Sequence, residues 1–260
     1  MPEGPEIKFI SELCKKKLLN SKLIDIVSNS KDIVKLPQIS KLIHVITKGK
    51  MLVLIFKDFY FHIHFGLTGW FTFERGDYPK YELTFEFDKK NIYCYIDDMR
   101  RFSKLKIYLN KKSHDKILDK LGVDILTTDY TLDYFQEKIK KQNKSLAAFL
   151  LEQDKFSGIG NYIKNESLYL ARINPHKKTG ELDDTQIKAL YESIKFVAYS
   201  NTIDLLKEKK LHVDPIFKSI KTKVPYYFNV YEQEKDLHGN KVTEEVIGGR
   251  RTFYVKSIQK

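Results

Sequence analysis

The chain has few cysteines and no long apolar segment. Cys14 and Cys94 are the only cysteines among its 260 residues, which is too few for a disulfide scaffold and is typical of a reducing compartment. No run of about 20 apolar residues, the length that crosses a bilayer, occurs in the sequence, and the N-terminus lacks a signal-peptide pattern. These absences argue against a disulfide-stabilised secreted domain, and we expect an intracellular protein without a transmembrane segment.

Arginine is also scarce. Only six basic residues are arginine, and four of them form the pairs Arg100-Arg101 and Arg250-Arg251. A guanidinium group is a planar donor that can bind an anion through two parallel hydrogen bonds, so each pair predicts an anion-binding site. The formal net charge of +12 favours a polyanionic partner such as nucleic acid, although a basic chain can also be merely well solvated.

The first six residues, Met1–Glu6, carry the most distinctive chemistry. If Met1 is removed, Pro2 begins the chain with a secondary amine, which titrates at about 7.7–8.0 and is therefore partly nucleophilic at neutral pH. Attack of this amine on a sugar C1′ gives a cationic iminium that cannot lose an N–H proton and so remains an electron sink. Glu3 and Glu6 stand close enough in sequence to transfer protons. The alternative is that Pro2 only precedes a helix whose first turn favours acidic residues.

The spacing of apolar residues predicts an α+β fold. An amphipathic helix is expected at 6–19, and short β-branched and aromatic runs separated by turns predict an eight-stranded β-sandwich. The expected strands are 24–27, 42–47, 51–56, 60–65, 70–73, 83–87, 91–96 and 103–108. Beyond a polar break at 110–115 the period becomes helical, with helices expected at 114–121, 131–140, 145–151, 159–171 and 184–199.

We therefore expect three segments. Residues 1–112 form the N-terminal helix and sandwich, residues 113–224 form a helical domain, and residues 225–260 form a β-hairpin around Gly248-Gly249.

Four further stretches favour contacts with nucleic acid. Lys50 follows a Gly in a basic turn, and Leu67 lies between two glycines, where an apolar side chain could enter a base stack. Arg100 and Phe102 combine a guanidinium with an aromatic ring, as proteins that hold unpaired bases do. Asn161 follows a Gly-Ile-Gly turn whose N–H groups would favour a phosphate. Each stretch also has a plain structural interpretation: a basic turn, a buried hairpin leucine, a surface ion-pair cluster and an ordinary helix start.

These motifs together resemble the formamidopyrimidine-DNA glycosylase and endonuclease VIII family. The resemblance runs in order along nearly the whole chain, through Pro-Glu-Gly-Pro-Glu-Ile at the start, Gly-Lys at 49–50, His-Phe-Gly-Leu-Thr-Gly at 64–69, Arg-Arg-Phe at 100–102, Leu-Gly-Val-Asp-Ile-Leu at 121–126 and Ser-Gly-Ile-Gly-Asn-Tyr-Ile-x-x-Glu at 157–166. It implies a β-sandwich joined to a helix-two-turns-helix domain, with DNA bound in the cleft between them.

One departure from the family concerns its C-terminal zinc finger. The four positions where the resemblance places cysteines hold Lys235, His238, Val255 and Ile258, which cannot form a tetrahedral sulfur site. We therefore expect the zincless finger of an endonuclease VIII-like subtype, with no metal and no cofactor. The hairpin should instead be packed by apolar side chains, for which we name Val242, Val246, Phe253 and Val255.

The resemblance implies a bifunctional DNA glycosylase and abasic-site lyase that acts on oxidised bases by β,δ-elimination. The implied catalytic residues are Pro2, Glu3, Glu6, Lys50 and Arg250. The implied DNA-binding residues are Leu67, Lys80, Arg100, Phe102, Lys144 and Asn161. The expected partner is damaged double-stranded DNA, with single-stranded DNA as a second candidate, and the protein is expected to be a monomer located with the DNA.

Three alternatives stay open at this point. A tautomerase-like enzyme also uses an N-terminal proline, but it would need neither the paired arginines nor a second domain. A non-catalytic damaged-DNA-binding protein could have the same fold, and only the removal of Met1 would distinguish the enzyme from it. Within the enzymatic interpretation, the N-terminal motif and the short segment from Phe217 to Tyr231 favour oxidised pyrimidines, whereas residues 100–102 favour the purine-directed branch.

Overall fold

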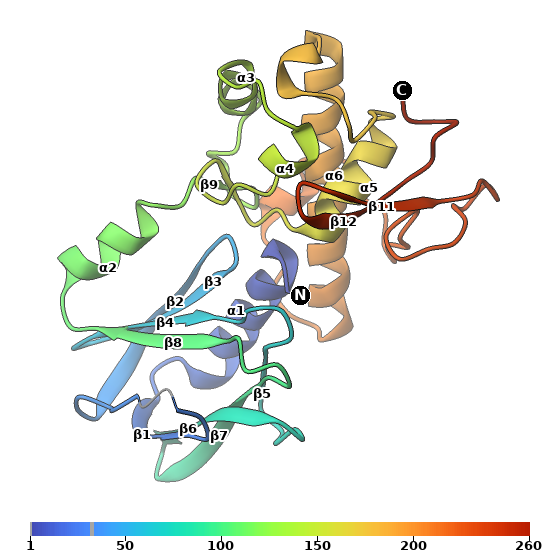
Figure 1. Ribbon diagram of the computed structural model, residues 1–260. Coiled ribbons are helices and arrows are strands. Elements are labelled where there is room, and N and C mark those ends of the chain that lie inside the picture. The colour runs from blue at the N-terminus through green and yellow to red at the C-terminus, as the bar shows by residue number, and fades with distance from the viewer. Residues whose placement is uncertain (1, 32–33) are drawn as a thin grey trace. The chain divides into compact units, whose positions relative to one another are not determined.

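The computed structural model describes residues 2–31 and 34–260, so the expected removal of Met1 lies outside the described residues. The chain forms two compact units (Figure 1). One contains Pro2 and Glu6–Lys120, and the other contains Glu3–Pro5 and Leu121–Lys260. No described helix is long and apolar enough to cross a membrane.

The first unit contains the predicted helix and all eight predicted strands. Helix α1 (Gly4–Leu18) buries Ile7, Ile10, Cys14 and Leu18 along one face, as their helical spacing requires. It is followed by β1 (Lys22–Ser28), β2 (Ser40–Lys48), β3 (Met51–Phe56), β4 (Tyr60–His64), β5 (Trp70–Thr72), β6 (Pro79–Phe87), β7 (Lys90–Asp97) and β8 (Lys104–Tyr108).

These strands pair in the order β5-β7-β6-β1-β2-β3-β4-β8, and every neighbouring pair is antiparallel. The join between β1 and β2 is short, with only the pairs Lys22↔Lys41 and Leu23↔Ser40, so the order divides there into two four-stranded halves that form separate layers in Figure 1. Phe56 of β3 and Phe85 of β6 stack at 6.2 Å between ring centroids and so join the two halves. The predicted sandwich is therefore confirmed.

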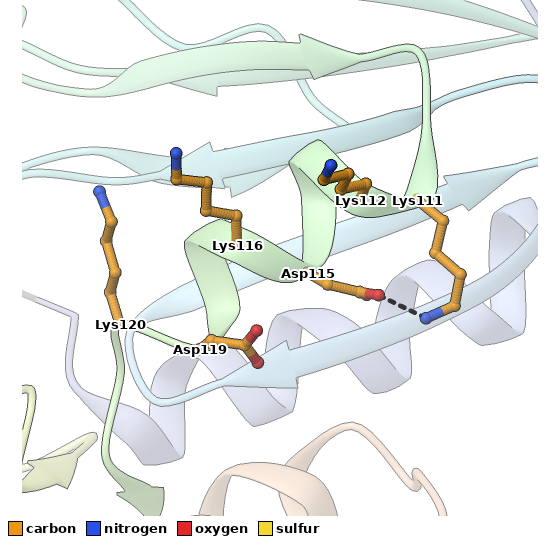
Figure 2. A pocket seen from close by; sticks show the side chains of 6 residues that line it. All are labelled: Lys111, Lys112, Asp115, Lys116, Asp119 and Lys120. Carbon is orange, nitrogen blue, oxygen red and sulfur yellow. Dashed lines mark hydrogen bonds and ion pairs between the residues drawn. The ribbon is translucent and has the colours of Figure 1, made fainter.

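Helix α2 (Lys111–Leu118) belongs to the first unit, although the sequence placed a domain boundary at 112/113. Its His114 is buried, and its ring stacks on that of Tyr60 with 4.1 Å between ring centroids. The Nδ1 atom of His114 lies 2.7 Å from the Nε2 atom of His62 on β4. These contacts tie α2 to the sheet and move the change of unit to Lys120/Leu121. Figure 2 shows the outer side of this region, a hollow lined by four lysines and two aspartates in which Lys111 pairs with Asp115.

The buried histidine pair predicts that the first unit loses stability in acid. Burial, with a smaller effect of His114, lowers the pKa of His62 to about 4. The unfolded chain takes up this proton near the ordinary pKa of about 6.5, so it gains protons first as the pH falls. The free energy of unfolding should therefore decrease between about pH 6.5 and about pH 4, by up to about 3 kcal/mol from this group.

The fluorescence of Trp70, the single tryptophan, reports this unit because it lies on β5. We expect urea titrations to show a weaker pH dependence for His62→Gln than for the unsubstituted protein. His44→Gln, at an exposed position on β2, serves as the control. An equal pH dependence in the protein and in His62→Gln would contradict the assignment.

The second unit is mainly helical. Its elements are β9 (Val123–Asp124), α3 (Leu132–Lys140), α4 (Leu146–Phe149), β10 (Phe156–Ser157), α5 (Asn161–Leu170), η1 (Thr179–Glu181), α6 (Asp184–Glu208), η2 (Pro215–Lys218), β11 (Thr243–Ile247) and β12 (Arg250–Tyr254). Thr131 caps α3 by accepting from the Tyr134 N–H, and Asp183 caps α6 by accepting from the Gln186 N–H at 2.8 Å, as Ser, Thr and Asp do at helix starts.

Helix α6 is longer than predicted. The predicted helix ended at Tyr199, and the next residues, Ser200-Asn201-Thr202, form a polar run with low helix propensity. The helix continues to Glu208, since Ser200 and Thr202 are buried and Thr202 bonds back to the Ala198 carbonyl at 2.7 Å. Ile203 and Leu206 then extend the buried face.

The predicted C-terminal hairpin is present and belongs to the second unit. Strands β11 and β12 pair from Thr243↔Tyr254 to Ile247↔Arg250, and Gly248 and Gly249 form the turn at φ +59° and +75°, a backbone that glycine favours. Among the residues proposed to pack the hairpin, Val242, Phe253 and Val255 are buried with Tyr169 and Val230. The prediction for Val246 was wrong, because its side chain is 70% exposed.

A carboxylate organises the loop that precedes β11. Asp236 is buried and accepts hydrogen bonds from the N–H groups of His238 and Asn240 and from the hydroxyl of Tyr169, at 2.8–2.9 Å. Among the described residues no group of three His, Cys, Asp or Glu side chains could hold a metal ion. The metal-free finger remains a prediction. The hydrogen bonds to Asp236 are one way in which this loop could be held without a metal ion.

Candidate active site

The carboxylate of Glu3 lies at the N-terminus of α5. Glu3 is 2% exposed and accepts backbone hydrogen bonds from Gly160 at 2.8 Å, Tyr162 at 2.9 Å and Ile163 at 3.3 Å. The first N–H groups of a helix lack partners within the helix and carry a partial positive charge, so they stabilise an anion. The sequence predicted a phosphate at this Gly-x-Gly turn, but the anion that occupies these donors is the side chain of Glu3.

Glycine at 160 is required by this contact. A Cβ atom added there would stand 2.1 Å from the carboxyl carbon of Glu3. The backbone of Gly160 has φ −125°, in the extended region that any residue adopts, so the requirement comes from the close approach alone. A further hydrogen bond joins the Gly4 N–H to the Gly158 carbonyl at 3.0 Å. Residues 3–5 are thus fixed to the second unit.

Pro2 directly precedes this fixed glutamate and is buried. The next carboxylate, Glu6, lies in the first turn of α1 and is partly buried. The ring nitrogen of Pro2 is therefore one residue from a buried carboxylate. The predicted roles of Pro2 as nucleophile and Glu3 in proton transfer remain predictions.

Strand β12 is joined to α5 by three side chains of the helix, at positions 161, 164 and 165. The Asn161 amide donates to the Arg251 carbonyl at 2.9 Å, and the Phe253 N–H donates to the Asn165 side chain at 3.3 Å. Between these two, the ammonium of Lys164 donates to the Thr252 hydroxyl at 2.9 Å. Lys164 was not predicted as a functional residue. A lysine is normally expected at the surface, and nothing in the sequence indicates that this one is buried.

The two arginines beside the hairpin turn differ in their surroundings. Arg251 forms a bidentate ion pair with Glu244, at 2.5 and 2.9 Å, and its guanidinium lies 5.0 Å from the centre of the Phe253 ring. Arg250 is the first residue of β12, next to the glycine turn, and both arginines are exposed. The two therefore differ in the ion pair of Arg251, and the role of Arg250 in binding phosphate remains a prediction.

Glu166, on α5, is a second buried carboxylate. In the sequence analysis it appeared only as the last residue of the motif at 157–166, with no role assigned. It accepts hydrogen bonds from the N–H groups of Asn229, Val230 and Tyr231 and from the hydroxyl of Tyr226, at 2.8–2.9 Å. Burial, reinforced by this carboxylate, raises the pKa of Tyr226. Glu166 therefore fixes the segment at 226–231 to the helix that holds Glu3.

In the first unit, Asp98 connects the two loops that carry Leu67, Arg100 and Phe102. Its buried carboxylate accepts from the Thr68 hydroxyl at 2.5 Å and from the Ser103 N–H at 2.6 Å. The Arg100 guanidinium lies 5.0 Å from the centre of the Phe102 ring, which is 50% exposed. These three predicted DNA-binding residues are therefore on neighbouring loops, with the arginine and the phenylalanine in contact.

Lys80 has a different place from the one that the sequence predicted. It is 1% exposed, and its ammonium donates to the carbonyls of Arg101 at 2.8 Å and Ser103 at 2.5 Å. The ammonium therefore faces the interior, and we correct the prediction of a direct DNA contact to a role in shaping the loop that carries Arg100 and Phe102. Arg101 is exposed but also contacts the backbone here, since its guanidinium donates to the Pro79 carbonyl at 3.0 Å.

The two remaining predicted lysines occupy exposed or partly exposed turns. Lys50 follows Gly49, which has φ +56°, in the turn between β2 and β3. Burial, with smaller effects of Lys50 and Lys104, lowers the pKa of His64, and His64 is the register partner of Lys104 across β4 and β8. Lys144 in the second unit is exposed and pairs with Glu152 at 2.8 Å.

Comparison with known proteins places both units in one family. Residues 1–105 match the family model described as the formamidopyrimidine-DNA glycosylase N-terminal domain, and residues 121–204 match the formamidopyrimidine-DNA glycosylase H2TH domain. The predicted helix-two-turns-helix domain is thereby confirmed.

Two curated relatives illustrate the sequence similarity. The chain is 35% identical over 168 residues to a formamidopyrimidine-DNA glycosylase of Arabidopsis thaliana, which covers 63% of this chain but 40% of that longer protein. It is 30% identical over 206 residues to one from Vesicomyosocius okutanii, covering 75% of this chain and 76% of the other.

Solved structures share the fold. The formamidopyrimidine-DNA glycosylase of Lactococcus lactis, non-covalently bound to DNA containing an abasic site, has a TM-score of 0.82 at 21% identity and covers 99% of both chains. The MutM protein of Thermus thermophilus has a TM-score of 0.81 at 22% identity, covering 99% of this chain and 98% of the other. Since two domain models match in order and a curated relative is 30% identical over three quarters of both chains, this chain belongs to the formamidopyrimidine-DNA glycosylase family.

Proposed function

We propose that the protein is a bifunctional DNA glycosylase and abasic-site lyase that removes oxidised bases from duplex DNA in base excision repair. The observation that carries the proposal is the position of Glu3, whose buried carboxylate is held by three backbone N–H groups one residue after Pro2. Membership of the family supports the same reaction class, and the structure of the Lactococcus lactis relative with abasic-site DNA is consistent with it.

In the proposed reaction the lone pair of the Pro2 nitrogen forms a bond to C1′ of the damaged nucleotide. The bond from C1′ to the base breaks, and the base leaves as an anion that takes a proton from water. The Glu3 carboxylate takes the proton that the Pro2 nitrogen loses and delivers it to the ring oxygen as the sugar opens, which leaves an iminium between Pro2 and C1′. Loss of a proton from the sugar then expels the 3′ phosphate, and loss of a second proton expels the 5′ phosphate. Hydrolysis of the iminium releases the enzyme and leaves a one-nucleotide gap.

The other predicted residues are given supporting roles. Lys50, Asn161 and Arg250 would bind phosphates around the lesion, and Lys50 and Arg250 would also donate protons during the eliminations, while Glu6 would orient the substrate. Leu67, Arg100 and Phe102 would fill the space left when the nucleotide turns out of the helix, a step that costs a few kcal/mol and least at a damaged pair. Lys144 remains a proposed surface contact with the DNA backbone.

A panel of duplex oligonucleotides tests this function and the preferred lesion. We expect oxidised pyrimidines and ring-opened purines to be excised faster than 8-oxoguanine, because the N-terminal motif and the short 217–231 segment favour that subtype. The measurement is single-turnover excision followed by separation of the cleaved strands, which distinguishes β- from β,δ-elimination products. Preference for 8-oxoguanine opposite cytosine would contradict the subtype. Binding of damaged duplex without excision of any lesion would favour the non-catalytic alternative.

A further inference from the structure

Lys164 is a charged side chain that is fully buried in the second unit, with 0% exposure. Its ammonium donates to the Thr252 hydroxyl at 2.9 Å and lies 3.4 Å from the Arg251 carbonyl. Burial, reinforced by Arg250 and opposed by Glu3, lowers the pKa of Lys164 to about 8, so at neutral pH the charged form still predominates.

A buried ammonium is an expensive way to attach a strand to a helix. Removing a charge from water costs several kcal/mol even after the protein relaxes, and an apolar residue of similar size is often no less stable. The strand already has two neutral attachments to α5, through Asn161 and Asn165. Attachment alone therefore does not account for a lysine at this position.

The contacts of Lys164 lead toward two groups of the proposed reaction. The Thr252 hydroxyl that accepts from Lys164 also donates to the Arg250 carbonyl at 3.2 Å, so a chain of hydrogen bonds runs from the ammonium to the backbone of Arg250. Lys164 lies on the same helix whose first N–H groups hold Glu3. The charged groups that act on its ammonium are Glu3, from the N-terminal segment, and Arg250, from β12.

We propose that Lys164 is a positioning residue for the reaction, because its ammonium fixes the backbone of Arg250 through Thr252 while α5 holds the carboxylate of Glu3. The inference rests on the proposed function, in which Glu3 and Arg250 both move protons at one nucleotide. Proton transfer requires correct separation of donor and acceptor, and a misplacement of about 1 Å can reduce a rate on the order of 10²-fold.

Four variants test this role. Lys164→Met keeps the length and apolar stem of the side chain, Lys164→Arg keeps its charge, and Thr252→Val removes the hydroxyl that links the ammonium to Arg250. Lys188→Met is the matched control, since Lys188 is an exposed lysine on α6 that lies 4.0 Å from Glu192. For each variant kcat and KM for excision are measured, and the concentration of competent sites is counted from the fraction that borohydride traps on abasic-site DNA.

We expect Lys164→Met to lower kcat per competent site on the order of 10²-fold with little change in KM. Thr252→Val should also lower kcat per competent site, because it removes the hydroxyl through which the ammonium holds the backbone of Arg250, and Lys164→Arg should recover most of the loss. A purely structural role would lower the number of competent sites and leave kcat per site unchanged, which would overturn the inference. Absence of excision by the unsubstituted protein would instead contradict the proposed function itself.

Discussion

Sodium borohydride is expected to trap the protein covalently on duplex DNA with one abasic site, and a residue added before Pro2 is expected to abolish the adduct. Hydride adds to C1′ of the iminium and converts it into a stable tertiary amine, which holds the DNA on the chain. An added residue turns the Pro2 nitrogen into an amide, whose lone pair is delocalised into the carbonyl and is no longer nucleophilic. The expected change is therefore from efficient trapping to none.

A removable extension provides the control in the same preparation. An N-terminal tag followed by a protease site that leaves Pro2 as the first residue should give no adduct before cleavage and a full adduct after it. Thermal unfolding before and after cleavage shows whether the extension disturbs the fold. An undiminished adduct in the uncleaved protein would exclude the Pro2 nitrogen as the nucleophile, and a lysine amine would then have to be sought by peptide mapping.

The elements of the fold could be predicted because local patterns specify them. All eight strands follow from short β-branched and aromatic runs between turns, and the helix α1 follows from helical spacing. The hairpin β11–β12 follows from strand-like runs on both sides of Gly248-Gly249. The end of α6 could not be predicted in the same way, because burial of Ser200 and Thr202 overrides their low helix propensity. The unit boundary shifted for a similar reason, since the docking of His114 on His62 is a tertiary contact.

The candidate site was predicted as a set of residue types but not as a set of contacts. Glu3 and the Gly158–Asn161 turn were both singled out, yet their hydrogen bonds join residues 157 to 160 positions apart in sequence, and no local pattern encodes such a pairing. Burial of a lysine is equally invisible in a sequence. Lys80 was therefore assigned to DNA although it binds the carbonyls of its own loop, and Lys164 was passed over although it lies beside Glu3 and Arg250.

The contact between Glu3 and Gly160 supports the second large effect. Gly160→Ala would place a methyl group 2.1 Å from the carboxyl carbon of Glu3, far inside contact distance, so the carboxylate must leave the N–H groups of α5. We expect a loss of excision on the order of 10²-fold or more, because the proton donor is misplaced. We also expect destabilisation of about 1–3 kcal/mol, as overpacking of a buried site usually produces.

A double-mutant cycle separates this clash from any other effect of the alanine. In a Glu3→Ala background the side chain that the new methyl group would meet is absent, so Gly160→Ala should cost far less stability there than in the unsubstituted protein. The coupling measured by chemical denaturation should fall at about 0.5–3 kcal/mol, the range for residues in direct contact. Gly180→Ala is the matched control, because a Cβ there would meet its nearest neighbour at an ordinary 3.4 Å. Equal destabilisation by Gly160→Ala in both backgrounds would show that Glu3 is not held against α5. Full excision activity in the single Gly160→Ala variant would show that the position of this carboxylate does not matter to the reaction.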